Sequence, residues 1–245
     1  MPRYRLTIEY DGSPFVGWQR QDNGRSVQQV LEDALLRFCN ERLVVHGAGR
    51  TDAGVHAAAQ VAHVDLARPA AASTVRDAIN FYLKPLPVVV LAAEPCDRTF
   101  HARFSAIERK YLYRILNRPA PPALERGRVW WIPKPLDTDA MVRASRVLEG
   151  HHDFSTFRST QCQARTAVKS LSLLDVRRQG DEIHIEARAR SFLHNQVRII
   201  AGTLARVGDG KWTADDVAAA LAACDRTRGG PTAPPQGLSL AGVGY

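Results

Sequence analysis

The stretch Tyr4-Arg5-Leu6-Thr7-Ile8-Glu9-Tyr10 alternates apolar and polar residues, and Asp11-Gly12 follows it directly. Such alternation is typical of a β-strand with one buried face, and the Asp-Gly pair favours a turn at its end. Further on, Ser26 and Gln29 stand at capping-box spacing. Behind them one helical face carries Val27, Val30, Leu31, Ala34, Leu35 and Phe38. The chain therefore opens with a strand followed by a helix.

The next elements complete one structural unit. Strand patterns cover residues 43–46 and 60–66. Ser73 is expected to cap a second helix, and residues 88–92 form a short apolar strand. The apolar side of that helix carries Val75, Ala78, Ile79 and Tyr82. The order of elements is β-α-β-β-α-β.

The second half repeats this order. Its expected elements are a strand at 111–116, a helix from Asp137 or Thr138, paired strands at 171–176 and 183–187, a helix at 193–207, a helix at 217–222 capped by Thr213 and Asp216, and a strand at 238–243. Two such units predict an α+β fold of two ferredoxin-like halves, residues 1–105 and 106–245. Their antiparallel sheets are expected to join side by side, which would bury open edges.

The charge of the chain indicates a polyanionic partner. The 245 residues are 45% hydrophobic, enough for a sizeable core, and carry a formal net charge of +8. A basic balance of this kind favours nucleic acid as a partner, although solubility alone is the simpler alternative. Of the 33 basic residues 28 are arginine, which matches phosphate better than lysine does. A coding bias towards arginine and alanine would give the same excess.

Several classes of protein are disfavoured. The four cysteines, Cys39, Cys96, Cys162 and Cys224, show no metal-ligand spacing and are expected to be reduced. Reduced cysteines are typical of a cytoplasmic protein. No 18-residue apolar run is evident, and neither a membrane span nor a signal peptide is expected. Neither a P-loop nor a GxSxG nucleophile turn occurs.

One segment departs from the pattern of core and turn. His46-Gly47-Ala48-Gly49-Arg50-Thr51-Asp52-Ala53-Gly54-Val55-His56-Ala57 joins two expected strands and holds three glycines within eight residues. Glycines let the backbone approach a ligand closely. Arg50, Asp52 and His56 in this loop are groups that serve catalysis. By itself, however, such an Asp is more often a turn or capping residue, and such a His more often structural.

This loop resembles the signature of the tRNA pseudouridine synthase A family. The resemblance rests on Gly49 to Ala57 and extends along nearly the whole chain in order. Its other motifs are Glu9-Tyr10-Asp11-Gly12 with Gly17-Trp18-Gln19, Phe100 to Ala106 with Arg109-Lys110-Tyr111, Asp153 to Arg158, Phe192-Leu193-His194 with Val197-Arg198, and Gly230 to Pro234 with Gly237-Leu238. The sequence departs from the family pattern at Asn195-Gln196 and at Ile199.

The resemblance implies an isomerisation of uridine to pseudouridine at positions 38, 39 and 40 of the tRNA anticodon arm, with no cofactor and no metal. Asp52 aligns with the catalytic carboxylate, acting as nucleophile or base. Tyr111 aligns with the tyrosine that stacks on the target base, although alone it would be assigned to the core. Arg198 aligns with the partner of the carboxylate, in an active-site cleft between the two halves. Arg50 is the competing partner.

Further residues in or beside these motifs are candidate RNA contacts. They are Arg20, Arg25, His56, Arg103, Arg109 and Arg158. The family also implies a homodimer.

Two other functions remain open at the level of sequence. A non-catalytic tRNA-binding module or chaperone on the same fold is one, although it would not need a carboxylate facing phosphates. A hydrolase that uses Asp52 and His56 is the other, and release of free uracil would indicate it.

Overall fold

The computed structural model describes all 245 residues, which divide by their contacts into two compact units. The first unit comprises Met1–Ile107 with Ser239–Tyr245, and the second comprises Glu108–Leu238. The sequence placed the last strand in the second half. By contacts it lies in the first unit, because Ser239 and Leu240 pair in parallel with the start of β3.

The first unit has the expected order of elements. They are β1 (Arg3–Tyr10), α1 (Val27–Cys39), β2 (His46–Gly47), β3 (His56–Asp65), α2 (Ala72–Leu83), β4 (Val88–Cys96) and, from the end of the chain, β10 (Leu238–Gly244). β1 pairs antiparallel with β4 on one side and with β3 on the other. β2 and β10 both pair with β3, antiparallel and parallel respectively. The strand expected at 43–46 is thus only the short β2, shifted towards the loop.

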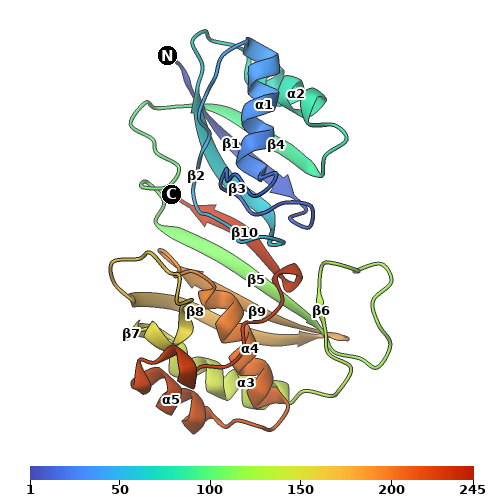
Figure 1. Cartoon of the computed structure of the whole chain (residues 1–245), viewed down its shortest axis with the longest axis vertical. Coiled ribbons are helices and arrows are strands. Elements are labelled where there is room, and N and C mark those ends of the chain that lie inside the picture. Colours follow the sequence, from blue (N-terminus) through green and yellow to red (C-terminus); the bar gives the residue numbers. More distant parts are fainter. The chain divides into compact units, whose positions relative to one another are not determined.

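Both helices of the first unit cover one face of its sheet, as Figure 1 shows for α1 and α2. Ser26 caps α1 by accepting a hydrogen bond from the Gln29 N–H at 3.2 Å. The residue expected to cap the second helix was wrong: the N-cap is Ala71, not Ser73. α2 begins at Ala72 behind Ala71, so Ser73 lies within its first turn and does not cap it. Val75, Ile79 and Leu83 are its buried residues.

The second unit is built around an antiparallel sheet in the order β5-β9-β8-β7. Its elements are β5 (Glu108–Leu116), β6 (Trp130–Trp131), α3 (Thr138–Ser145), β7 (Gly150–Asp153), β8 (Val168–Gln179), β9 (Glu182–Ala189), α4 (Gln196–Gly208) and α5 (Ala214–Ala223), with short 3-10 helices at Arg146–Leu148, Ser155–Phe157, Arg226–Arg228 and Pro235–Gly237. β6 pairs in parallel with the end of β5. Each unit thus combines helices with a mostly antiparallel sheet, and the α+β class is confirmed.

The helix starts of the second unit largely follow the sequence. Asp137 caps α3, and Thr213 forms a reciprocal capping box with Asp216 at α5, as expected. α4 begins three residues later than expected, at Gln196, because Asn195 adopts a left-handed conformation with φ of 62°. The short strands β6 and β7 were not expected.

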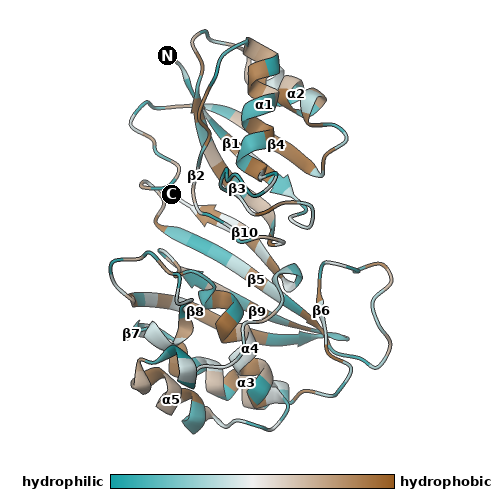
Figure 2. Cartoon of the chain, in the orientation of Figure 1, coloured by the Kyte–Doolittle hydropathy of each residue, from teal (hydrophilic) through white to brown (hydrophobic).

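Hydropathy differs between the strands of the two units (Figure 2). β4 is predominantly hydrophobic, whereas β5 begins with the charged residues Glu108, Arg109 and Lys110. None of the helices has the length and apolar character needed to cross a bilayer.

Candidate active site

Asp52 lies in a tight turn between β2 and β3. The Val55 N–H donates to the Asp52 carbonyl oxygen at 3.1 Å, which closes the turn. Gly54 occupies its third position with φ of 75°, a conformation that suits glycine there. The Asp52 side chain is half-buried. Gly54 thus has the unusual backbone conformation that was expected of a glycine in this loop. Ala53, which precedes it in the turn, is exposed.

The turn is held from outside by the segment that follows β1. The Trp18 N–H donates to the Thr51 carbonyl at 3.0 Å, and the Gly54 N–H donates to the Phe15 carbonyl at 3.4 Å. Two glycines permit this approach. A Cβ on Gly12 would lie 2.0 Å from the Val55 carbonyl oxygen, and one on Gly17, whose φ is 113°, would lie 2.6 Å from that of Thr51.

Buried side chains hold the residues before the turn. The Tyr10 hydroxyl and Thr51 Oγ1 are hydrogen-bonded at 2.8 Å, and Gln60 Nε2 donates to the Gly49 carbonyl at 2.9 Å. Burial raises the pKa of Tyr10 to about 12, with hydrogen bonding to Thr51 and then Gln60 acting the other way. Gln60 Oε1 itself is buried without a hydrogen-bond partner. The phenol therefore stays neutral near the loop.

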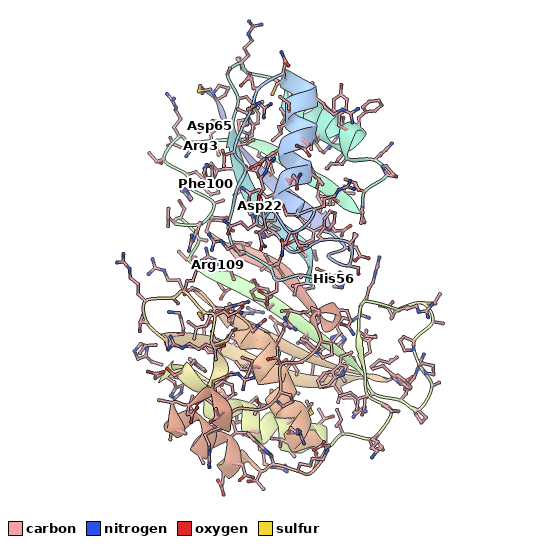
Figure 3. The ribbon with its side chains drawn as sticks, in the orientation of Figure 1. Arg3, Asp22, His56, Asp65, Phe100 and Arg109 are labelled. Carbon is pink, nitrogen blue, oxygen red and sulfur yellow. The ribbon has the colours of Figure 1, made fainter.

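His56, the first residue of β3, holds the turn after β1 in place. Its buried Nδ1 accepts the Gly12 N–H at 3.1 Å and also lies 3.2 Å from Asp11 Oδ1. One nitrogen cannot accept from Gly12 and donate to Asp11 at once, so the contact with Gly12 requires an Nδ1 that carries no proton. Figure 3 shows His56 and Asp65 at opposite ends of β3. These contacts support an anchoring role for His56.

Arg50 is placed differently from its neighbours in the loop. It is exposed, and its side chain forms no ion pair or hydrogen bond with the rest of the chain. The loop around Asp52 thus presents one guanidinium to solvent.

Tyr111 lies in β5, opposite Ala187 of β9, and is 8% exposed. Its ring meets the ring of Phe192 edge to face, with centroids 5.1 Å apart and an interplanar angle of 90°. Edge-to-face packing fixes one ring relative to the other. Phe192 is therefore a positioning residue for Tyr111, and it stands in a motif that the sequence had singled out without a role.

Arg198 is fixed in the first turn of α4 by two hydrogen bonds from its own guanidinium. Nε donates to the Ala233 carbonyl and Nη1 donates to Asn195 Oδ1, each at 2.8 Å. The Ala233 N–H in turn donates to the Arg198 carbonyl at 3.1 Å. The segment after Gly230 is thereby attached to α4 by both the main chain and the side chain of Arg198.

The departure from the family pattern at Asn195-Gln196 has a structural role. Asn195 ends the preceding turn and binds Arg198, and the buried Gln196 accepts the Leu193 N–H through Oε1 at 2.8 Å. Both residues support the Arg198 region, which sequence alone left in doubt. An Asn at a helix start is the one signal that could have indicated this.

Tyr113 lies beside the same segment. Its hydroxyl donates to the Pro234 carbonyl at 2.8 Å. Burial raises the pKa of Tyr113 well above its usual range, and the nearby charge of Arg198 opposes that shift. Tyr113 therefore remains a neutral donor that fixes the segment to β5.

The candidate RNA contacts differ in exposure. Arg25 and Arg103 are exposed, and Arg158 is half-buried. Arg103 also lies over the ring of Phe104, with its guanidinium carbon 5.7 Å from the ring centroid.

Two other arginines are already engaged. Arg20 is exposed but pairs with Glu32 at 3.1 Å. Arg109 is 8% exposed, and its Nη1 donates to the Arg190 carbonyl at 2.5 Å. Arg109 is thus better placed to support the sheet than to contact phosphate.

No group of three or more His, Cys, Asp or Glu side chains is arranged to hold a metal ion. Three histidines of the first unit, His46, His63 and His101, lie together. His63 and His101 lie edge to face at 4.6 Å between ring centroids, and the Nδ1 atoms of both accept main-chain N–H groups. These nitrogens are therefore occupied by the fold.

The chain matches known proteins along its length. A family model described as tRNA pseudouridine synthase matches residues 6–105 and 144–245. A protein of Paramagnetospirillum magneticum named tRNA pseudouridine synthase A is 61% identical over all of this chain and 96% of its own length. Proteins of the same name from Rhodospirillum centenum and Parvibaculum lavamentivorans are 61% and 59% identical over the whole of both chains.

A solved structure titled as a Cbf5-Nop10-Gar1 complex is much more distant. It aligns with a TM-score of 0.37 at 11% identity, over 82% of this chain and 45% of its own, which is too weak to bear on fold or function. The family model and the full-length relatives are sufficient without it. The chain belongs to the tRNA pseudouridine synthase family.

Proposed function

We propose that the chain isomerises uridine to pseudouridine at positions 38, 39 and 40 of the tRNA anticodon arm, with Asp52 as the catalytic carboxylate. Membership of the tRNA pseudouridine synthase family is the evidence for the isomerisation of uridine in tRNA. The observation that most supports Asp52 is the construction of its turn, which is closed by Val55 and held by Trp18. A non-catalytic binding module has no evident need for an acidic residue whose main chain is held in this way.

The reaction exchanges one bond to the ribose for another. The bond between uracil N1 and ribose C1′ breaks, a bond from C5 to C1′ forms, C5 loses its proton and N1 gains one. The balance needs no oxidant, reductant or bound cofactor. Asp52 acts in its ionised form, as nucleophile or base.

Two residues of the second unit support this role. Tyr111 is proposed to stack on the target base, which stabilises binding by about 1–3 kcal/mol. Phe192 holds its ring in one orientation. Arg198 is proposed to stabilise the ionised carboxylate, since a guanidinium offers a planar fork suited to two carboxylate oxygens. Reaching a base within a folded stem-loop requires that base to flip out of its stack.

The finer architecture is part of the proposal. Residues 1–105 and 106–245 are proposed as two ferredoxin-like halves. The first unit supports this with its β-α-β-β-α-β order and the neighbouring strands β4-β1-β3. A homodimer is proposed from the family resemblance, and a cytoplasmic location from the unpaired cysteines.

The direct test is to incubate the protein with an unmodified tRNA transcript and to map pseudouridine chemically. Modification at positions 38 to 40, unaffected by chelator once the tRNA is folded, is the expected result. Binding without modification would favour the non-catalytic module. Release of free uracil would indicate a hydrolase.

A further inference from the structure

The second unit contains a cavity of about 310 Å³ between α4 and the segment that carries β6. Trp130, Ile132 and Pro133 line one side, and Gly202 and Ala205 of α4 line the other. The volume lies at the lower end of the range of about 300–1,000 Å³ that is typical of small-ligand sites. The cavity is thus large enough for one nucleotide.

The wall opposite α4 is fixed although it has almost no regular structure. Asn117 Nδ2 donates to the carbonyls of Ile132 and Lys134 at 3.0 and 2.6 Å, and its Oδ1 accepts the Leu136 N–H at 3.1 Å. Trp130 meets Tyr113 edge to face at 6.1 Å between centroids. A wall held at both ends in this way is preformed.

The α4 wall of the cavity is made of small residues. Ala205 contributes only a methyl group, and Gly202 contributes none. A Cβ on Gly202 would lie 1.9 Å from the Pro231 carbonyl oxygen, so only glycine lets the loop at Pro231 close over this part of the helix. Pro231 itself lines the cavity.

The rim of this apolar cavity carries two cations without partners. Lys134 is exposed and Arg206 is half-exposed, and neither side chain forms an ion pair or hydrogen bond with the chain. The one acidic residue of the rim, Asp209, pairs with Lys211. The rim is therefore complementary to an anion, while the interior is suited to a flat apolar group.

We propose that this cavity binds one unstacked nucleotide of the RNA substrate, with its base against Trp130 and its phosphate between Lys134 and Arg206. Aromatic and guanidinium groups recognise splayed bases in this manner. The choice of an RNA nucleotide rests on the proposed function. Arg198, Gly202 and Arg206 lie along one face of α4, with Arg206 about 12 Å from Arg198 at 1.5 Å per residue. The loop of Pro231 and Ala233 joins the two places.

Free nucleotide provides the first test. In NMR spectra of the full chain, adenosine 5′-monophosphate should shift the Trp130 indole N–H and the Gly202 amide in a saturable manner, with the indole assigned through Trp130→Phe. Inorganic phosphate at the same concentration should leave the indole signal in place. Ala205→Met, which fills the cavity without altering charge, should abolish the shift. An unmoved indole, or an equal shift in Ala205→Met, would overturn the proposal.

Binding of tRNA at several salt concentrations provides the second. Arg206→Ala should reduce the slope of log Kd against log salt by about 1, as expected for a lost phosphate contact. Ala205→Met should raise Kd about tenfold, equivalent to a weakly stacked base, with the slope unchanged. Arg143→Ala, an exposed arginine on α3, is the matched control and should match the wild type in both.

The two tests separate this proposal from the proposed function. If the slope for Arg206→Ala equals that of the wild type and Ala205→Met binds tRNA normally, the cavity does not hold an RNA nucleotide. If the wild type binds tRNA but forms no pseudouridine, the proposed function fails, while the nucleotide titration still reports on the cavity.

Discussion

The two regions that carry the proposed catalytic groups are fixed by different means. In the first unit, main-chain hydrogen bonds to Trp18 and Phe15 hold the loop around Asp52, and Gly12 and Gly17 make room for it. In the second unit, the guanidinium of Arg198 is held by the hydrogen bonds that it donates to the Ala233 carbonyl and to Asn195 Oδ1. The position of the carboxylate thus depends on residues that lack side chains, whereas that of the cation depends on polar atoms.

Adding one methyl group at Gly12 should break the first arrangement. Its Cβ would lie 2.0 Å from the Val55 carbonyl oxygen, so the turn that holds Asp52 must move. A displacement of about 1 Å typically costs about 100-fold in rate, and we expect a loss of that order in single-turnover pseudouridine formation.

Gly49→Ala is the matched control for Gly12→Ala. It lies in the same loop, and a Cβ there would meet nothing within 4 Å. Gly49→Ala should retain nearly full activity and melting temperature. Equal activity of the two variants would show that the close approach at Gly12 does not position the turn.

Replacing the fork of Arg198 should weaken the second arrangement while preserving its charge. Arg198→Lys cannot hold the Ala233 carbonyl and Asn195 at once and still present a planar fork. We expect the single-turnover rate at saturating tRNA to fall by about tenfold or more. Asn195→Ala, which removes one of the two hydrogen bonds, should show a smaller loss in the same direction.

Saturation decides what kind of role Arg198 has. A residue that only clamps phosphate recovers its rate once the enzyme is saturated with tRNA, whereas a partner of the catalytic carboxylate does not. Full recovery in Arg198→Lys and Arg198→Ala would transfer the pairing role to Arg50. Melting temperatures measured beside the rates exclude loss of the fold as the cause.

The contrast between the regions also explains what sequence could predict. Tyr4 to Tyr10, Asp137 and the Thr213–Asp216 box are local patterns, and each formed the element that it predicts. The strand β7 was not predicted, because Gly150–Asp153 is a polar edge segment whose only partner strand is β8. Ser73 was expected to cap α2 because serine is a common capping residue. The sequence does not show whether such a residue stands just before the helix or within its first turn.

The candidate site divides in the same manner. Asp52, Tyr111 and Arg198 were indicated by family motifs, and their catalytic roles stay predictions. Their supporting residues stand in the same motifs, but the contacts could not be predicted, because the hydrogen bonds from Tyr10 to Thr51 and from Arg198 to Ala233 join residues 41 and 35 positions apart. Asn195, which departs from the family pattern, had a signal of another kind, as an Asn that precedes a helix.

The smallest expected effect concerns pH and falls on the first unit alone. Burial, followed by the charges of Arg3, His101 and His46, lowers the pKa of His63 to about 4, with Asp65 opposing the shift. Arg3 holds Asp65 in a bidentate pair at 2.8 and 2.7 Å, beside Phe100 (Figure 3). His63 is neutral when folded, but it binds a proton below about pH 6.5 when unfolded, so stability falls as pH falls through that range.

On going from about pH 7 to about pH 5.5, protonation of His63 in the unfolded chain should lower the free energy of unfolding by about 1 kcal/mol. Denaturant titrations at the two pH values would measure the loss. His63→Asn keeps an acceptor for the Ala102 N–H but does not titrate, so its loss should be smaller by that amount. Identical pH slopes for the two proteins would contradict the assignment.

The central claim is that Asp52 is the catalytic carboxylate, and Asp52→Asn tests it most directly. The variant keeps the shape of the side chain and the backbone turn but loses the ionised oxygen. In a tritium-release assay on tRNA labelled at uridine C5, it should show no turnover above background while melting and binding tRNA like the wild type. Substantial tritium release by Asp52→Asn would contradict the claim.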